Sequence, residues 1–272
     1  MAEIIPLPAS TVVLIRDSER GLETLLMQRN LNSGFMAGMH LFPGGGLDAA
    51  DASVEAAGLC AGIDDAAASR ILGVDRGGLA YWIAAIRESF EEAGVLLAYD
   101  ASGNMMLLDK PDEIARFSGH RRALNAGERE LIALLRDEGL RPAADQLVYF
   151  SRWITPEGAP RRYDTRFFVA QAPAAQEALH DNSELIGHAW MNPGAALDKF
   201  RSGELKMRTP TVWTLEQFSA YASAQSLLSA MRAQRDIPAM LPRINKNGER
   251  LLPGDPGYEE AAFAEGRGKW QM

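Results

Sequence analysis

Two short apolar runs separated by a charged segment near the start of the chain predict a β-hairpin. Apolar runs at 11–15 and 24–27 flank a charged turn at 16–21, so we expect two paired strands between residues 10 and 28. Similar runs, bounded by turn residues, predict further strands at 95–99, 146–154, 163–170 and 185–191.

Helical periodicity is clearest over 79–93, and Gly94 follows at the position where a glycine commonly ends a helix. Further helices are expected at 111–139 and 193–200, with a long amphipathic helix over 211–232 and a short helical excursion within 49–78. After Pro238 the sequence is rich in proline, glycine and polar residues, which predicts an extended tail. Strands and helices that mix without strict alternation favour a mixed sheet covered by helices.

Composition limits the class of protein. The chain has 272 residues, of which 47% are hydrophobic and 24% charged, ordinary values for a globular protein with its own core. Its single cysteine excludes an internal disulfide framework and a cysteine-rich zinc site. No apolar run approaches the ~20 residues of a membrane span. Neither a signal peptide at 1–6 nor a peroxisomal address at 269–272 can be recognised, so a cytoplasmic protein is expected.

Charge adds a constraint on the partner. The formal net charge is −8, which disfavours nucleic acid as a partner. An acidic protein can still bind an anionic substrate when divalent cations lie between its carboxylates and the phosphates of the ligand.

Three glutamates of the helix expected at 79–93 could hold such cations. At about 100° per residue, Glu88, Glu91 and Glu92 share one face, and the apolar residues Ile83, Ile86, Phe90 and Ala93 cluster on the other. Like charges at this spacing repel, and clustered carboxylates suit Mg²⁺ or Mn²⁺. The alternative is a solvated acidic face without a ligand.

The surroundings of these glutamates resemble the Nudix family. Residues 87–95 read RESFEEAGV and residues 42–45 read FPGG, which match the second half of the family signature and its entry. Ser89 occupies a usually apolar position, and Asp51 stands where the family has a glutamate that pairs with the signature arginine, here Arg87. The signature is also split, because Asp51 and Arg87 are 36 positions apart rather than eight, an apparent insertion of about 28 residues.

Such an insertion resembles one branch of the family, which includes the peroxisomal coenzyme A diphosphatase of mammals. The likeness extends over about residues 8–220, through segments at 25–29, 35–40, 153–156, 161–168 and 190–193. It implies a Nudix domain over 8–235, folded as an α/β/α sandwich with a mixed sheet. A helical insertion at 52–79 and a C-terminal helix would decorate this domain, and residues 236–272 would form the extended tail.

The resemblance implies metal-dependent hydrolysis, with Mg²⁺ or Mn²⁺, of a diphosphate bond in a nucleoside diphosphate derivative. Coenzyme A or acyl-coenzyme A is the favoured substrate. Hydrolysis of ADP-ribose, NADH or a nucleotide sugar remains open, as does a non-catalytic Nudix module that binds a nucleotide and regulates a partner. A small-molecule nucleotide is thus the expected partner, without nucleic acid or membrane, and a homodimer is left open.

The resemblance also assigns roles to residues. Glu88, Glu91 and Glu92, with the carbonyl of Gly44, would hold the metal, and one of the glutamates would act as the base. Arg87 would orient the glutamates and the loop at 44–46.

Four residues outside the signature are predicted to bind substrate: Arg29, Arg162, Arg166 and Glu184. The arginines, like the neighbouring Arg161, are candidates because a guanidinium binds phosphate through two parallel hydrogen bonds. Solvent exposure or pairing with Asp164 is the alternative for those near residue 164. Glu184 is chosen from its position just before a predicted strand.

Overall fold

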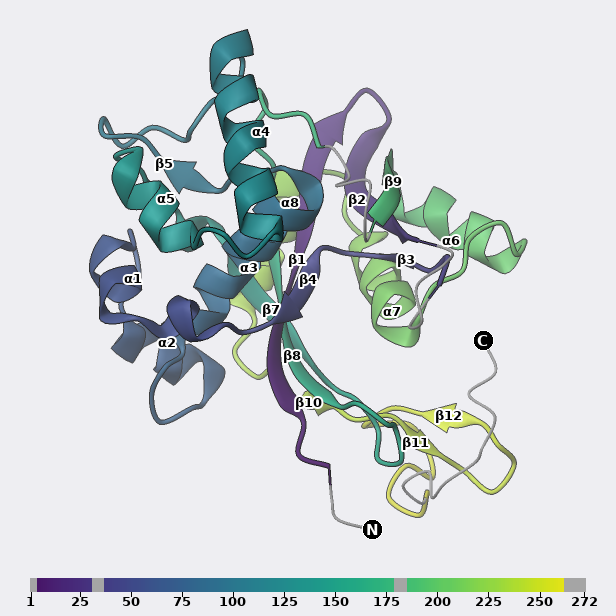
Figure 1. Ribbon diagram of the computed structural model, residues 1–272. Helices are drawn as coiled ribbons and strands as arrows, with labels where there is room; N and C mark the ends of the chain where they lie inside the picture. Colours follow the sequence, from purple (N-terminus) through teal and green to yellow (C-terminus); the bar gives the residue numbers. More distant parts are fainter. Residues whose placement is uncertain (1–3, 31–36, 179–184, 262–272) are drawn as a thin grey trace.

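One large mixed sheet organises the molecule, for which a computed structural model describes residues 4–30, 37–178 and 185–261 (Figure 1). Its central strands run in the order β10-β7-β8-β1-β2-β3, while β4 pairs with β1 and β9 with β2. The pairs β1–β8 and β7–β10 are parallel and the others antiparallel. The strands are β1 (Leu7–Ser18), β2 (Gly21–Arg29), β3 (His40–Leu41), β4 (Gly44–Gly46), β7 (Val148–Ile154), β8 (Tyr163–Gln171), β9 (Leu185–Met191) and β10 (Ala239–Met240).

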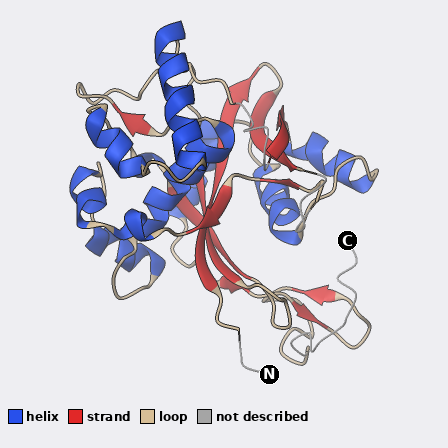
Figure 2. Ribbon diagram, viewed as in Figure 1, coloured by secondary structure: helices blue, strands red, loops and turns tan. Residues whose placement is uncertain are grey.

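Helices cover both faces of this sheet, as Figures 1 and 2 show. Val12 and Leu14 of β1 pack into the core beneath α1 to α5, whereas Val13 and Ile15 pack beneath α6 to α8. The alternation follows from the period of two along a strand. The predicted α/β/α sandwich with a mixed sheet is therefore confirmed. The helices are α1 (Val54–Leu59), α2 (Asp65–Leu72), α3 (Leu79–Ala93), α4 (Pro111–Asn125), α5 (Leu131–Asp137), α6 (Pro193–Arg201), α7 (Thr209–Phe218) and α8 (Ala224–Ala233).

The residues between β4 and α3 form the expected helical insertion. After a short 3₁₀ helix at Ala49–Ala52, α1 and α2 lead into α3. The carboxylate of Asp65 accepts hydrogen bonds from the backbone N–H groups of Gly77 (3.0 Å) and Leu79 (2.9 Å), so α2 supplies the cap that the start of α3 lacks. A Cβ on Gly78 would lie 2.3 Å from the backbone nitrogen of Ser69, which shows how closely the insertion packs on α3.

Two predicted elements differ from the structure. The helix expected over 211–232 is divided into α7 and α8, because the Ser223 side chain caps α8 and the Ala224 N–H donates to Asp17 at 2.8 Å. The strand expected at 95–99 is confined to β5 (Ala98–Tyr99), which pairs with β6 (Arg141–Pro142), and Val95 to Leu97 are buried without strand pairing.

Within the segment expected to form an extended tail, residues 239–261 contain short strands. There β10 adds to the edge of the sheet at β7, and β11 (Arg243–Ile244) pairs with β12 (Arg250–Leu251). The Tyr258 hydroxyl donates to the carbonyl of Leu241 at 2.8 Å, which ties the segment together. Strands of two residues are too short to give a hydrophobic period, so the sequence pattern does not indicate them.

None of the helices in 4–30, 37–178 and 185–261 combines the length and the apolar character needed to cross a membrane.

Candidate active site

Helix α3 runs from Leu79 to Ala93 as predicted and ends at Gly94, which adopts a left-handed conformation with φ 70°. Its apolar residues, among them Ile83 and Phe90, are buried in the core. Glu88 and Glu92 are also buried, at 7% and 8% exposure. A solvated acidic face would leave both carboxylates in water, so that interpretation of the glutamates is excluded.

The glycine turn of β4 covers the acidic side of α3. The Gly44 N–H donates to Glu92 Oε2 at 2.9 Å. A Cβ on Gly45 would lie 2.4 Å from Glu88 Oε1, and one on Gly44 would lie 2.5 Å from Thr11 Oγ1 of β1. Glycine is therefore required at position 44, where a Cβ would also lie 2.6 Å from the backbone oxygen of Ser10, whereas a Cβ at position 45 would displace the Glu88 carboxylate.

Arg87 joins the two halves of the split signature. Its Nε and Nη2 donate to Asp51 Oδ1 and Oδ2 at 3.2 and 3.1 Å, so the expected pairing across the insertion is confirmed. Its Nη1 donates to Glu88 Oε1 at 2.8 Å and to Glu91 Oε2 at 3.0 Å. Nη2 also donates to the carbonyl of Gly46 at 2.7 Å. One guanidinium thus contacts the glutamates, the glycine turn and Asp51 together.

The charges in this cluster are not balanced. Asp51, Glu88 and Glu91 share the single positive charge of Arg87, and Glu92 lies beside them on the same helix. Burial raises the pKa of Glu88 to about 7, and it also raises the pKa of Glu91 and of Asp51. Burial acts to lower the pKa of Arg87, but its hydrogen bonds to Asp51 and the surrounding carboxylates outweigh that effect and raise it.

The carboxylates of the three glutamates are of the chemical type that binds divalent cations. Within the described residues no three acidic, histidine or cysteine side chains surround a common point, because Arg87 holds Glu88 and Glu91 while the Gly44 N–H holds Glu92. The set nevertheless offers hard oxygen donors and an excess of negative charge in a buried place, which a Mg²⁺ or Mn²⁺ ion would offset.

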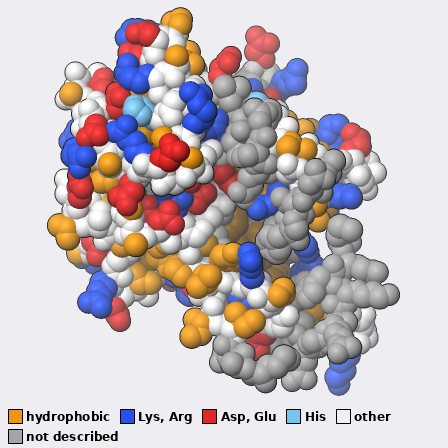
Figure 3. Space-filling view, in the orientation of Figure 1, with side chains coloured by type: hydrophobic (Ala, Val, Ile, Leu, Met, Phe, Trp, Pro, Cys, Tyr) orange, Lys and Arg blue, Asp and Glu red, His pale blue; other side chains and the backbone are white. Residues whose placement is uncertain are grey.

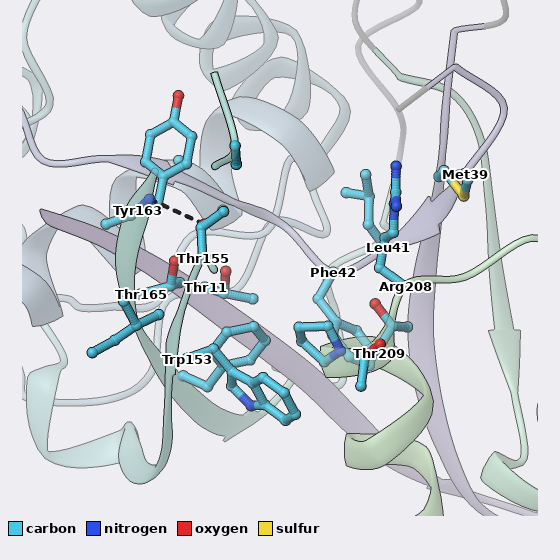
Figure 4. Close-up of a pocket in the computed structure, with 18 of the residues that line it drawn as sticks. Thr11, Met39, Leu41, Phe42, Trp153, Thr155, Tyr163, Thr165, Arg208 and Thr209 are labelled. Carbon is cyan, nitrogen blue, oxygen red and sulfur yellow. Dashed lines mark hydrogen bonds between the residues drawn. The ribbon is translucent and has the colours of Figure 1, made fainter. Parts of the chain in front are cut away.

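A cavity of about 570 Å³ borders the glycine turn, and Glu88, Glu91 and Glu92 are not among the residues that line it. Trp153 and Thr165 line it from β7 and β8, and Figure 4 shows Phe42 and Thr209 on the opposite wall. Four arginines line it, Arg29, Arg161, Arg208 and Arg250, and no described lining residue is Asp or Glu. In Figure 3 basic and hydrophobic side chains lie where this face is hollowed, while acidic and basic ones are mixed over the helices at the left. The cavity therefore suits an anionic ligand with apolar parts.

The predicted substrate-binding residues lie in different environments. Arg29 lines the cavity at the end of β2. Arg162 is buried and donates to the carbonyls of Thr155 and Ile4, at 3.0 and 2.8 Å. Arg166, 2% exposed, binds Asp164 and lies over the ring of Tyr81. Neither of the two buried arginines lines the cavity, so their positions do not support a substrate contact, and the pairing with Asp164 holds for Arg166. Glu184 lies outside the described residues.

The sequence pattern does not indicate that Arg208 and Arg250 line the cavity. Arg208 precedes α7, and Arg250 lies in the segment expected to form an extended tail, to which the sequence assigns no site residue. The two arginines meet because the hairpin of the tail folds against the start of α7.

Comparison with known proteins identifies the family. A family model described as the NUDT19 Nudix domain matches residues 72–218, more than half of the chain. The chain belongs to the NUDT19 family of Nudix hydrolases. The resemblance noted in the signature is thereby confirmed, including the branch with the split box.

Two curated relatives of this NUDT19-type hydrolase carry the name acyl-coenzyme A diphosphatase NUDT19. The protein of Homo sapiens is 31% identical over 283 aligned residues, which cover 90% of this chain and 75% of the relative. That of Gallus gallus is 30% identical over 289 residues, covering 92% and 76%. A crystal structure of a Nudix hydrolase from Alicyclobacillus acidocaldarius superposes with a TM-score of 0.65 at 30% identity, over 83% of this chain and 96% of that one. Nudix hydrolases generally use divalent metal ions.

Proposed function

We propose that this Nudix hydrolase cleaves the diphosphate bond of coenzyme A or acyl-coenzyme A, with Mg²⁺ or Mn²⁺ held by Glu88, Glu91, Glu92 and the carbonyl of Gly44. The observation that carries the proposal is the buried glutamate cluster packed against a glycine turn that borders an arginine-lined cavity. The names of relatives that match most of this chain at about 30% identity support the choice of substrate.

The bound ions would neutralise charge on the diphosphate and make a water molecule a stronger nucleophile. The residues of the chain arrange the groups around that chemistry. Arg87 fixes Glu88 and Glu91 relative to each other and to the glycine turn. One of the glutamates accepts the proton of the attacking water at a carboxylate oxygen.

The cavity would hold the rest of the substrate. Its aromatic lining, which includes Trp153 and Phe42, suits the apolar parts of a nucleotide conjugate, and its arginines suit the phosphates. A location in the cytoplasm and the oligomeric state stay predictions from the sequence.

A product assay with matched variants tests the proposal. Wild-type protein with Mg²⁺ should convert coenzyme A to phosphopantetheine and adenosine 3′,5′-bisphosphate. It should act less efficiently on NADH, ADP-ribose and a sugar nucleotide. Glu91→Gln should lower kcat by roughly 100-fold or more, whereas Glu216→Gln, which removes an exposed carboxylate of α7, should leave kcat unchanged.

Other results of this assay would change the assigned substrate or the assigned activity. Preferred turnover of ADP-ribose or NADH would move the enzyme to another substrate class. If no compound of the panel is hydrolysed in a metal-dependent way and Glu91→Gln changes nothing, the chain is a nucleotide-binding Nudix module rather than a hydrolase.

A further inference from the structure

Two arginines in the cavity carry positive charge that no carboxylate among the described residues offsets. Within the described part of the chain, Arg208 and Arg250 form no ion pair, and the Nε of Arg208 is buried without a hydrogen-bond partner. By contrast, Arg152 of β7, a strand that also lines the cavity, is paired with Asp164 at 2.7 Å. In a chain with a net charge of −8, a wall whose described lining has arginines but neither Asp nor Glu is locally positive.

The two guanidinium groups also act on each other. Burial lowers the pKa of Arg250, and the positive charge of Arg208 lowers it further. Such mutual repulsion is unfavourable in the free protein and is relieved when an anion binds between the two groups.

The start of α7 adds to the positive potential at this wall. Arg208 is the N-cap residue of this ten-residue helix, and no side chain caps its first turn. Thr209 and Thr211 line the cavity, so the positive end of the helix dipole is directed at the same space. The Nη1 of Arg250 donates to the hydroxyl of Thr209, which fixes the tail hairpin β11–β12 to the helix start.

We propose that Arg208 and Arg250 bind a phosphate monoester of the substrate that is separate from the diphosphate that is cleaved. A monoester carries nearly two negative charges at neutral pH, which matches two guanidinium groups. This inference rests on the proposed function, because it concerns the same cavity and divides its ligand into a cleaved part and a recognised part. Coenzyme A carries such a group on its ribose, whereas ADP-ribose and NADH do not.

The two arginines therefore determine substrate choice rather than the chemical step. The tail takes part in this choice because it supplies Arg250, and Pro242 of the same segment lines the cavity. The Nudix signature itself would be common to hydrolases with and without this preference.

Ligand binding without metal tests the proposal apart from catalysis. Calorimetry with a chelator would compare adenosine 3′,5′-bisphosphate with AMP, which differ by one phosphate monoester. Wild type should bind the bisphosphate roughly tenfold or more tightly than AMP. Arg250→Gln and Arg208→Gln should bring this ratio close to one while leaving the affinity for AMP unchanged.

The control is Lys246→Gln, which removes a positive charge from the exposed turn of the same hairpin without touching the cavity wall. It should keep the wild-type ratio. Arg250→Gln changes a residue in that largely exposed hairpin, so it keeps the test valid if Arg208→Gln does not fold.

The proposal is overturned if wild type shows no preference for the bisphosphate. It is also overturned if the arginine variants lose affinity for AMP and the bisphosphate equally, because the arginines would then bind the phosphate next to the cleaved bond. Failure of the proposed function alone would give a different result. Wild type would then prefer the bisphosphate, yet no phosphopantetheine would form from coenzyme A with Mg²⁺.

Discussion

Removing the Asp51 carboxylate tests whether the pair with Arg87 joins the split halves of the Nudix box. Asp51→Ala deletes two hydrogen bonds from Arg87 and one from the backbone N–H of Asp48, which donates at 2.8 Å. The carboxylate is buried, at 3% exposure for the residue, so water cannot replace these bonds in the folded protein. We expect the variant to be clearly destabilised.

The size of the loss in stability depends on the contacts that Arg87 retains in the variant. Breaking a buried pair and leaving an isolated charge costs about 3–5 kcal/mol. Arg87 retains Glu88, Glu91 and the carbonyl of Gly46, and the unfavourable burial of the Asp51 charge is removed as well. The expected loss is therefore about 2–3 kcal/mol, near the value of one or two hydrogen bonds to a charged group. It corresponds to a fall in Tm of roughly 5–10 °C for a domain of this size.

Thermal and urea unfolding with a chelator present would measure this loss. Asp48→Asn is the matched control, because the Asp48 carboxylate lies 3.5 Å from Arg87 Nε but its side chain is 66% exposed. An exposed pair contributes little, so this variant should stay within about 0.5 kcal/mol of wild type. Equal unfolding midpoints for Asp51→Ala, Asp48→Asn and wild type would refute the reasoning that the buried pair holds the box together.

Two further predictions concern the glutamate cluster. Burial raises the pKa of Glu88 to about 7, so between pH 4.5 and about 7 the folded, metal-free protein holds a proton that the unfolded chain has lost. Its free energy of unfolding should fall over that range, by at most about 3 kcal/mol from this group, and urea unfolding of Glu88→Gln should show a flatter pH dependence. An equal slope in both proteins would contradict the assigned pKa. Gly45→Ala should lower kcat/KM for metal-dependent hydrolysis by at least about tenfold, because its Cβ would meet Glu88 Oε1 at 2.4 Å. Gly58→Ala, which has open space in α1, should leave kcat/KM unchanged, and equal activity of the two variants would show that the turn tolerates a side chain.

The elements nearest the chemistry could be predicted because their signals are local. The period of apolar residues and Gly94 predicted both ends of α3, and apolar runs bounded by turn residues predicted β1, β2, β7, β8 and β9. The pair of Asp51 and Arg87 was accessible only through the resemblance to the family, since nothing in the intervening residues indicates that they meet.

The cavity wall could not be predicted in the same way. Arg166 lies in β8 and Arg162 directly precedes it. This strand is buried on both faces, so its sequence lacks the alternation of apolar and polar residues that would show which side chains reach solvent. Arg208 and Arg250 come together because the hairpin of the tail folds back on α7. Tertiary contacts of this kind leave no period in the sequence.

The insertion within the Nudix box also has a consequence for the entropy of ring closure. For a flexible segment, widening the separation of Asp51 and Arg87 from about eight positions to 36 costs only about 1.3 kcal/mol, because the penalty grows with the logarithm of the length. The bidentate contact that closes the ring is of the same size or larger. A box split by two helices can thus keep the pair of Asp51 and Arg87, because a longer spacer adds little to the entropy of closing the ring.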